Sequence, residues 1–137
     1  MEIKFKLWIE QNGITLFGHG LEELLKGIDE YQSLFGAARK LKMSYRAAWG
    51  KIKDAEKRTG IQLVVTNGRK GMLLTENARR IVMEFENMEN NINQLLHDCS
   101  NSFPIPDLGG MQNESHPLPT SKMLEHSRLH MPHRAYA

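Results

Sequence analysis

The sequence predicts a mostly α-helical fold with two small β-hairpins, and three observations support this class. First, apolar residues recur at helical spacing in four separate segments. Second, an Asn-Gly pair lies between two short β-prone runs at both residues 12–13 and 67–68. Third, with 137 residues, of which 40% are hydrophobic and 25% charged, the chain has the size and composition of one globular domain.

The chain begins with a predicted β-hairpin. Residues 3–9 alternate, with apolar side chains on one face and Lys4, Lys6 and Trp8 on the other, which is a strand pattern. Asn12-Gly13 predicts a tight turn, and residues 14–17 form the return strand.

Three helices are expected next. Leu21, Leu24, Leu25 and Ile28 mark an amphipathic helix. Ser33 is a plausible N-cap for a short helix over residues 34–41. Ser44 is a second candidate N-cap, for a longer helix that runs to about Thr59 and stops at Gly60.

A second hairpin and a long helix complete the predicted domain. Residues 62–66 are β-prone, residues 67–71 are rich in turn formers, and residues 72–74 return. Thr75 is an acceptable N-cap for a helix that extends to about residue 98.

The connection between the second and third helices indicates their arrangement. It contains only Lys42 and Met43, too few residues for antiparallel packing, so the two helices should cross. Such a crossing needs small residues at the contact, and the sequence offers four alanines: Ala37, Ala38, Ala47 and Ala48. With residues 62–74 as a wing, these features predict a winged helix-turn-helix.

Charge is concentrated in one part of the chain. Residues 39–70 contain ten basic and two acidic side chains, a net charge of about +8, whereas the whole chain carries only +2. A basic segment of this kind is typical of a nucleic-acid-binding face, although a solvated basic surface is the alternative. We therefore expect double-stranded DNA as a partner.

The helix after Ser44 presents the side chains that would reach DNA. Its polar and aromatic face lies opposite its apolar face. Arg46 can donate two hydrogen bonds to a guanine edge, and Gly50 lets the backbone approach the duplex. Ser44 and Lys42 suit phosphates, as do the two cations of the wing. The candidate DNA-binding residues are Lys42, Ser44, Tyr45, Arg46, Trp49, Gly50, Lys53, Arg69 and Lys70.

The last helix, about residues 76–98, carries apolar residues at alternating steps of three and four. This apolar stripe could pack on the domain itself. A helix of about 22 residues, however, is roughly 33 Å long, more than so small a domain can cover, so a second copy of the chain is the expected partner. The predicted homodimer interface consists of Ile81, Phe85, Met88, Ile92 and Leu95.

The segment AARKLKMSYRAAWGKIKDAEKRTG, followed by a glycine-bearing wing and LLTENARRI, resembles the N-terminal domain of ModE, a molybdate-responsive regulator related to the LysR-type DNA-binding domain. The resemblance covers about residues 1–98. It implies a dimer on a palindromic site, with Ser44, Tyr45 and Arg46 meeting DNA. The wing is shorter than the family's glycine-rich one. Nothing after residue 100 could form the molybdate-binding domains of full-length ModE, so we expect the single-domain form and no molybdate site.

Residues 1–98 are thus predicted to form the domain and residues 99–137 a flexible tail containing proline and histidine. His126, His130 and His133 are weak candidates for a metal site, which would make the protein a metal-responsive regulator. A winged-helix module for protein contacts is another alternative. We expect no enzymatic activity and no cofactor, because no catalytic or cofactor-binding motif is present. A single cysteine and no apolar run long enough for a membrane favour a cytoplasmic protein.

Overall fold

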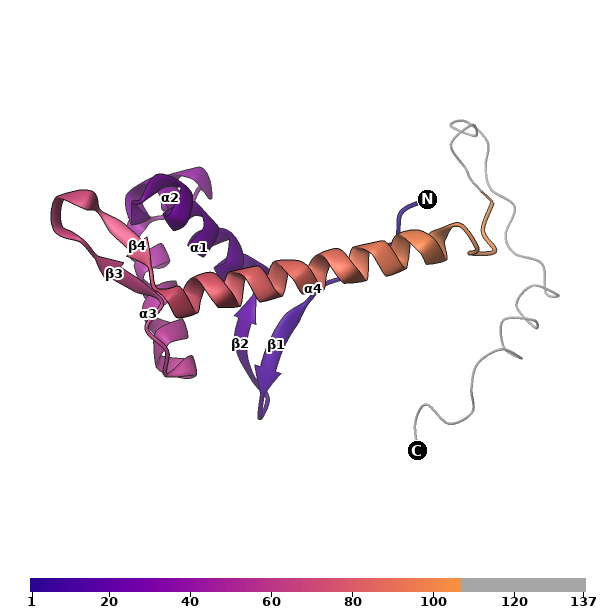
Figure 1. Ribbon diagram of the computed structural model, residues 1–137, viewed down its shortest axis with the longest axis horizontal. Coiled ribbons are helices and arrows are strands. Elements are labelled where there is room, and N and C mark those ends of the chain that lie inside the picture. The colour runs from indigo at the N-terminus through magenta and orange to yellow at the C-terminus, as the bar shows by residue number, and fades with distance from the viewer. Residues whose placement is uncertain (107–137) are drawn as a thin grey trace. The chain divides into compact units, whose positions relative to one another are not determined.

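The computed structural model describes residues 1–106, of which Glu2–Phe103 form one compact unit. This unit is mostly helical with two antiparallel hairpins, which confirms the predicted class (Figure 1). A single turn of 3₁₀ helix, Gly68–Lys70, forms the tip of the second hairpin. The elements are β1 (Trp8–Gln11), β2 (Ile14–Gly18), α1 (His19–Tyr31), α2 (Leu34–Lys40), α3 (Tyr45–Thr59), β3 (Val64–Thr66), β4 (Met72–Leu74) and α4 (Glu76–Ser100).

The β1–β2 hairpin turns at Asn12 and Gly13, whose φ angles of 52° and 78° suit a two-residue loop. Strand β1 begins at Trp8, not at Ile3 as the alternation predicted. Trp8 pairs with Gly18, the last residue of β2, and α1 begins at His19. The residues before Trp8 therefore have no residue of β2 with which to pair. The alternation itself persists: Ile3, Phe5 and Leu7 are half-buried, whereas Lys4 and Lys6 are exposed.

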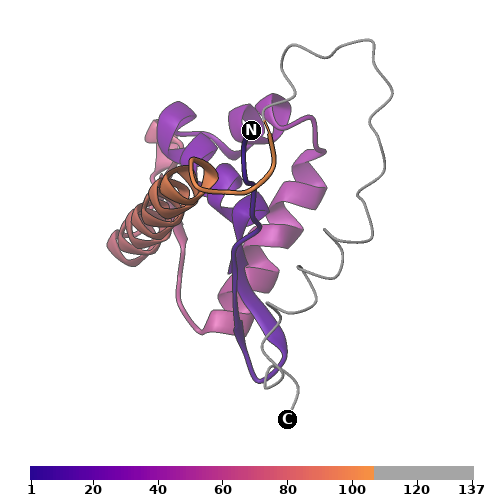
Figure 2. The ribbon, with the colours of Figure 1, turned by 90° about the vertical axis from the view of Figure 1, so that its right-hand side faces the viewer.

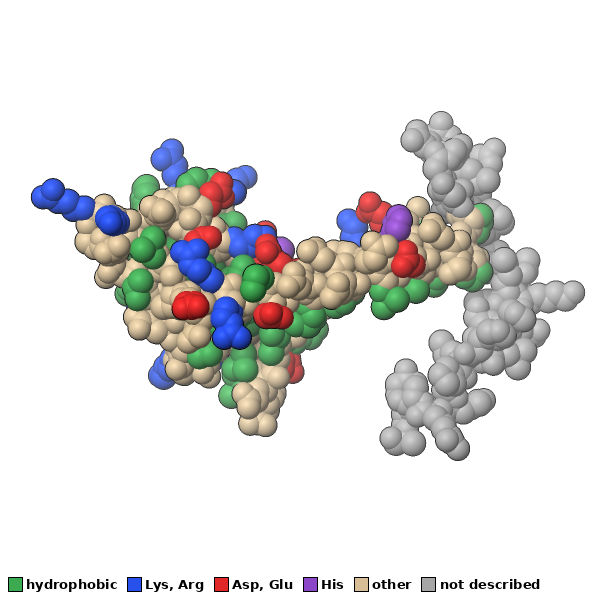
Figure 3. Space-filling view, viewed as in Figure 1, with side chains coloured by type: hydrophobic (Ala, Val, Ile, Leu, Met, Phe, Trp, Pro, Cys, Tyr) green, Lys and Arg blue, Asp and Glu red, His purple; other side chains and the backbone are tan. Residues whose placement is uncertain are grey.

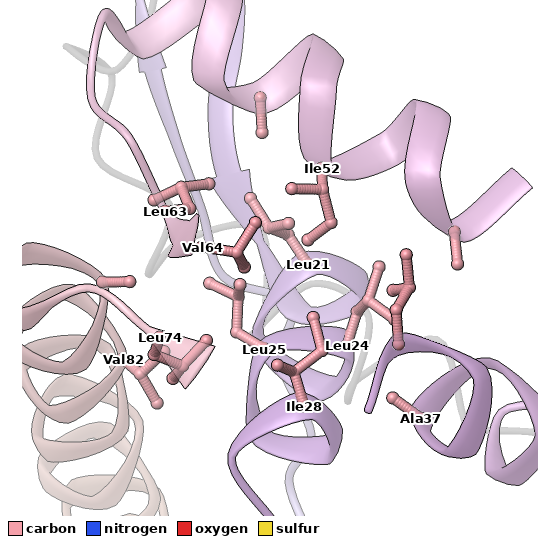
Figure 4. Packing of buried hydrophobic residues seen from close by; sticks show 14 of the residues in the cluster. Leu21, Leu24, Leu25, Ile28, Ala37, Ile52, Leu63, Val64, Leu74 and Val82 are labelled. Carbon is pink, nitrogen blue, oxygen red and sulfur yellow. The ribbon is translucent and has the colours of Figure 1, made fainter. Parts of the chain in front are cut away.

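Helix α1 lies at the centre of the hydrophobic core. Leu21, Leu24, Leu25 and Ile28 are at most 4% exposed, as their spacing predicted, and they face side chains from α3, β3, β4 and α4 (Figure 4). In Figure 2, the β1–β2 hairpin lies between α4 and α3. The core therefore joins both hairpins and all four helices into one packed body.

Local hydrogen bonds fix the helix ends where the sequence placed them. The Oγ atoms of Ser33 and Ser44 accept hydrogen bonds from the backbone N–H groups three residues on, both at 3.0 Å. Thr75 Oγ1 accepts one from Ala78 N–H at 3.1 Å. Gly60 ends α3 in the left-handed conformation, with φ 71°. The three predicted N-caps and the predicted end of α3 are confirmed.

The turn from α2 to α3 is tight, although α2 ends one residue earlier than predicted. Lys42 adopts a left-handed backbone, with φ 56°, and Met43 N–H donates to the Ala38 carbonyl at 3.0 Å. Helix α2 ends at Lys40 and α3 begins at Tyr45, so the chain changes direction over the four residues 41–44. This geometry is the basis of the helix-turn-helix arrangement.

The small residues at the helix contacts differ in part from the prediction. Ala37, Ala38 and Ala48 are buried, but Ala47 is exposed because it lies on the outward side of the first turn of α3. Gly27 of α1 is a further small residue at a helix contact, and no pattern in the sequence predicts it. A Cβ at Gly27 would lie 2.9 Å from the Cβ of Ala37, so the close approach of α1 and α2 requires a glycine there.

The β3–β4 hairpin is attached to the corner between α1 and α2. Met72 N–H donates to the Gln32 carbonyl oxygen at 3.0 Å. Gly71, with φ 82°, lies against the same oxygen, and a Cβ at this position would overlap it. Only glycine adopts this conformation without strain. The hairpin is therefore held in a fixed position relative to the helix-turn-helix.

Helix α4 is buried along its first half only. Ala78, Val82 and Phe85 belong to the core, and the Phe85 ring meets that of Phe17 edge to face, with centroids 4.9 Å apart. This corrects the prediction that Phe85 lies on an exposed dimer stripe. Phe85 is 1% exposed because β2 covers it, so it is not available to a second chain. The rest of α4 continues beyond the core (Figure 1).

Helix α4 ends at Ser100, two residues later than predicted. The candidate metal ligands His126, His130 and His133 lie outside the described residues, as does most of the predicted tail. Within residues 1–106, no helix is long and apolar enough to cross a membrane.

Candidate nucleic-acid interface

The first turn of α3 is presented to solvent. Tyr45 is 51% exposed and Arg46 is exposed, and neither makes an ion pair or side-chain hydrogen bond with any described residue. Ser44 is also exposed, but its hydroxyl is occupied as the N-cap of α3. The first backbone N–H groups of the helix and two polar side chains are thus accessible at one helix end, which is the arrangement required for contact with a phosphate and a base edge.

Trp49 and Lys53 form a packed pair on the next turns of α3. Trp49 is half-buried against the core, and the Lys53 ammonium lies 4.6 Å from the centre of its ring. Lys53 Nζ also lies 3.0 Å from Glu56 Oε1. Both side chains therefore have structural partners within the protein, unlike Tyr45 and Arg46.

Glu56 connects α3 to the wing, a role that the sequence analysis missed. Its Oε2 accepts a hydrogen bond from Leu63 N–H at 2.7 Å, just before β3. Burial raises the pKa of the Glu56 carboxyl, but the hydrogen bonds from Leu63 and Lys53 lower the pKa by more, so the net shift is downward. The ionised carboxylate thus orients α3 relative to the strand that follows it.

Gly50 has no packing reason to be a glycine. A Cβ at this position would meet nothing within 4 Å, and the residue lies in the interior of a helix, where glycine is unfavourable. Open space beside the backbone of α3 is compatible with the close approach of another molecule.

The wing carries Arg69 and Lys70 at its tip, in the 3₁₀ turn, and both are exposed. Asn67 N–H donates to the Gly71 carbonyl at 2.7 Å, and Lys70 N–H donates to the Asn67 carbonyl at 2.9 Å, so the tip has a defined backbone. Figure 3 shows Lys and Arg side chains projecting at the end of the body where this hairpin lies.

Most of the positive charge between residues 39 and 70 is unpaired. Lys40 Nζ lies 2.9 Å from Glu30, and Lys53 pairs with Glu56. Within residues 1–106, the other eight cations of this segment make no ion pair, and all are exposed. They are Arg39, Lys42, Arg46, Lys51, Lys57, Arg58, Arg69 and Lys70, and we call them the free cations.

A second accessible surface follows α4. A groove of about 330 Å³ separates the first half of α4 from β1 and the segment after α3, with Ile9, Ile61, Ile81 and Met88 among its lining residues. Apolar side chains also gather along one edge of α4 beyond the body (Figure 3). Of the predicted dimer residues, Ile81 and Ile92 are half-buried, and Met88 and Leu95 are 40% and 61% exposed.

Comparison with known proteins identifies the helix-turn-helix. Residues 23–79 match the family described as bacterial regulatory helix-turn-helix protein, lysR family. The matched segment runs from α1 through α2, α3 and the wing into the first turn of α4, and so contains both helices of the motif. No curated protein matches the chain. The LysR-type part of the resemblance is thus supported, whereas its narrower assignment to ModE is not confirmed.

Proposed function

Because residues 23–79 carry a LysR-type helix-turn-helix, we propose that this protein is a sequence-specific transcriptional regulator that binds a palindromic operator as a homodimer. One observation supports DNA binding above the others. The exposed N-terminal end of α3, with Tyr45 and Arg46, lies in the same segment as the eight free cations. Recognition of bases and neutralisation of phosphates are thus provided by one part of the chain.

Helix α3 is the proposed major-groove helix. Arg46 donates to the O6 and N7 atoms of a guanine, and Tyr45 lies beside it at the exposed helix end. The first N–H groups after Ser44 face a phosphate. Gly50 lets the helix backbone come close to the duplex, since no side chain stands between them.

The cations outside α3 position the protein without reading sequence. Arg69 and Lys70 at the wing tip contact the adjacent backbone or minor groove, and Lys42 contacts phosphate from the turn before α3. Because Lys53 is already paired with Glu56, we assign it a smaller share of DNA binding than Arg46.

Selection of bound sequences from a randomised duplex library tests this function and identifies the site. A regulator acting as a dimer should enrich an inverted repeat. Binding to the selected duplex should then weaken steeply with salt, on the order of a thousandfold between 50 and 200 mM for about six phosphate contacts. Failure to enrich any sequence, together with salt-insensitive binding, would instead support a winged-helix module for protein contacts.

The proposed homodimer rests on α4. Its apolar stripe beyond the core continues from the groove at Ile81 and Met88 to Leu95, and a helix of a second chain is the simplest occupant of a stripe with heptad spacing. The stripe is accessible in the described part of the chain, in contrast to Phe85.

Leu95→Asp tests the dimer without altering the core, because Leu95 is 61% exposed. We expect this variant to sediment as a monomer. Met83→Asp is the matched control, since Met83 lies on α4, is 52% exposed and faces away from Ile92 by about half a turn. The dimer interface is wrong if Leu95→Asp sediments as the unchanged protein does.

We further infer that DNA recognition is ModE-like and that the protein acts in the cytoplasm. The ModE part rests on Met43, Ser44, Tyr45, Arg46 and Trp49, which carry the resemblance in this sequence. If the Tyr45→Ala and Arg46→Ala variants no longer prefer the selected half-sites over other sequences, those two residues read the bases, and this result would support the inference.

A further inference from the structure

A second charged cluster joins α1 to α4, away from the helix-turn-helix. His19, in the first turn of α1, and Glu22, one turn later, meet Glu89 from the middle of α4. One potential ligand atom from each of the three lies within 4.8 Å of the others. His19 Nδ1 lies 3.3 Å from Glu22 Oε1 and 4.0 Å from Glu89 Oε2.

Glu22 is an unusual residue at the floor of this cluster. Its side chain is 3% exposed, and its Oε2 atom has no hydrogen-bond partner among the described residues. A buried carboxyl group beside a second carboxylate is costly unless a proton or a cation accompanies it.

The His19 ring is oriented as a metal-binding imidazole would be. Its Nε2 lies 3.2 Å from Glu23 Oε1, an exposed carboxylate outside the cluster, which can hold the Nε2 proton. The Nδ1 lone pair then faces Glu22 and Glu89. A histidine that ligates a metal through one nitrogen usually donates the other N–H to a carboxylate in this way.

We propose that His19 Nδ1, Glu22 and Glu89 bind one divalent transition-metal cation of the zinc class and so connect α1 to α4. Three ligands of this kind with an open fourth position are typical of zinc, and ligand atoms around a tetrahedral zinc lie about 3.3 Å apart. The separations from Nδ1 are 3.3 and 4.0 Å, and the three ligand atoms all lie within 4.8 Å of one another. His19 is exposed, so water can complete the coordination.

Lys26 lies near the cluster, but its ammonium group is paired with a carboxylate outside it. Lys26 Nζ pairs with Glu86 of α4, one turn before Glu89. The cluster thus holds two carboxylates against one imidazole, and its acceptor atoms exceed its donors. The competing explanation is an ion pair between protonated His19 and the carboxylates, with no metal, and this would not respond to zinc.

Direct titration tests the site independently of DNA binding. The full-length chain should carry His126→Ala, His130→Ala and His133→Ala, so that tail histidines do not contribute. After dialysis against EDTA, calorimetric titration with Zn²⁺ near pH 7.5 should show one equivalent per chain. His19→Gln and Glu89→Gln should each remove it. Glu84→Gln, an exposed carboxylate on the same helix, and His97→Ala should retain it.

Thermal unfolding supplies a second measurement. Zn²⁺ should raise the Tm of the parent chain, because a ligand that binds only the folded state stabilises it. Glu22→Gln removes the buried charge and keeps the side-chain volume, so this variant should fold and show no Zn²⁺-dependent shift. Zinc binding that is unchanged in His19→Gln and Glu89→Gln, or a full Tm shift in Glu22→Gln, would overturn the proposal.

Discussion

The charges on the two sides of the body serve different purposes. On the α1–α4 side, Arg79 lies 2.8 Å from Asp29, Lys26 pairs with Glu86, and His19 lies among carboxylates. On the side of α2, α3 and the wing, the eight free cations have no carboxylate partner within residues 1–106. The first set joins two helices, whereas the second contributes only repulsion until an anion binds. Substitutions on the two sides should therefore change different measured quantities.

The largest effect is expected on the α1–α4 side, at Phe85. Phe85→Ala removes a fully buried ring that contacts Phe17, and large-to-small changes of this kind cost about 3–5 kcal/mol. Denaturant unfolding should show this loss. Protein that remains folded should still bind DNA, because Phe85 is not one of the proposed DNA-binding residues. A loss below about 1 kcal/mol would mean that α4 is not part of the core.

Glu56 belongs to the side of α3 and the wing, and its effect should depend on pH. Glu56→Gln removes hydrogen bonds to a charged group, worth about 1.5–3 kcal/mol in total at pH 7. Because the folded-state pKa is lowered, the carboxylate stabilises the fold above its ordinary pKa of 4.5, and this stabilisation is lost as the pH falls through the folded-state value. The free energies of unfolding of the two proteins should converge in acid. A difference that is constant from pH 7 to acid would contradict the assignment.

Arg46 gives the clearest contrast between the sides. Arg46→Ala should cost about 1–3 kcal/mol of discrimination between the selected operator and a changed sequence, with stability nearly unchanged. Lys70→Ala should weaken binding to all sequences about equally. Arg79→Ala is the matched control: it removes an arginine from an exposed ion pair, costing at most about 1 kcal/mol of stability and no DNA affinity. If Arg46→Ala and Lys70→Ala both retained full affinity, the proposed DNA-binding face would be wrong.

The smallest expected effect has opposite signs in the two measurements. Gly50→Ala should raise the free energy of unfolding by about 0.5–1 kcal/mol, because alanine is the better helix former and the added methyl group meets nothing. The same methyl group should reduce affinity for the operator. Thermal unfolding and gel-shift titration of one preparation measure both. Increased stability with undiminished affinity would place Gly50 outside the interface.

The sequence predicted what depends on residues close together in the chain. Ser33, Ser44 and Thr75 cap helices through hydrogen bonds that span three residues, so a local pattern suffices to find them. The Asn12-Gly13 turn and the short α2–α3 connection are local in the same sense. The apolar residues of α3 all lie on one face of the helix, which must pack on the core. The opposite face, including the first turn of the helix, must therefore face solvent.

Features that depend on distant contacts could not be predicted. Heptad spacing does not distinguish a partner's helix from the domain's own strands, so it predicts a dimer contact for Phe85, whose ring packs against Phe17 of β2. Glu22 and Glu89 meet only because α1 packs beside α4. Gly27 is needed because a Cβ at this position would lie too close to the Cβ of Ala37 in α2, and no pattern within α1 reveals that contact.

The attachment of the wing to the Gln32 carbonyl determines where the chain can tolerate changes in length. Residues added between Asn67 and Lys70 would extend the exposed tip outward and leave the rest in place. One residue added between Gly71 and Thr75 would instead shift β4 by a position and turn Met72 and Leu74, both buried, toward solvent. Related chains with longer wings are therefore expected to differ at the tip and to keep the length of the second strand.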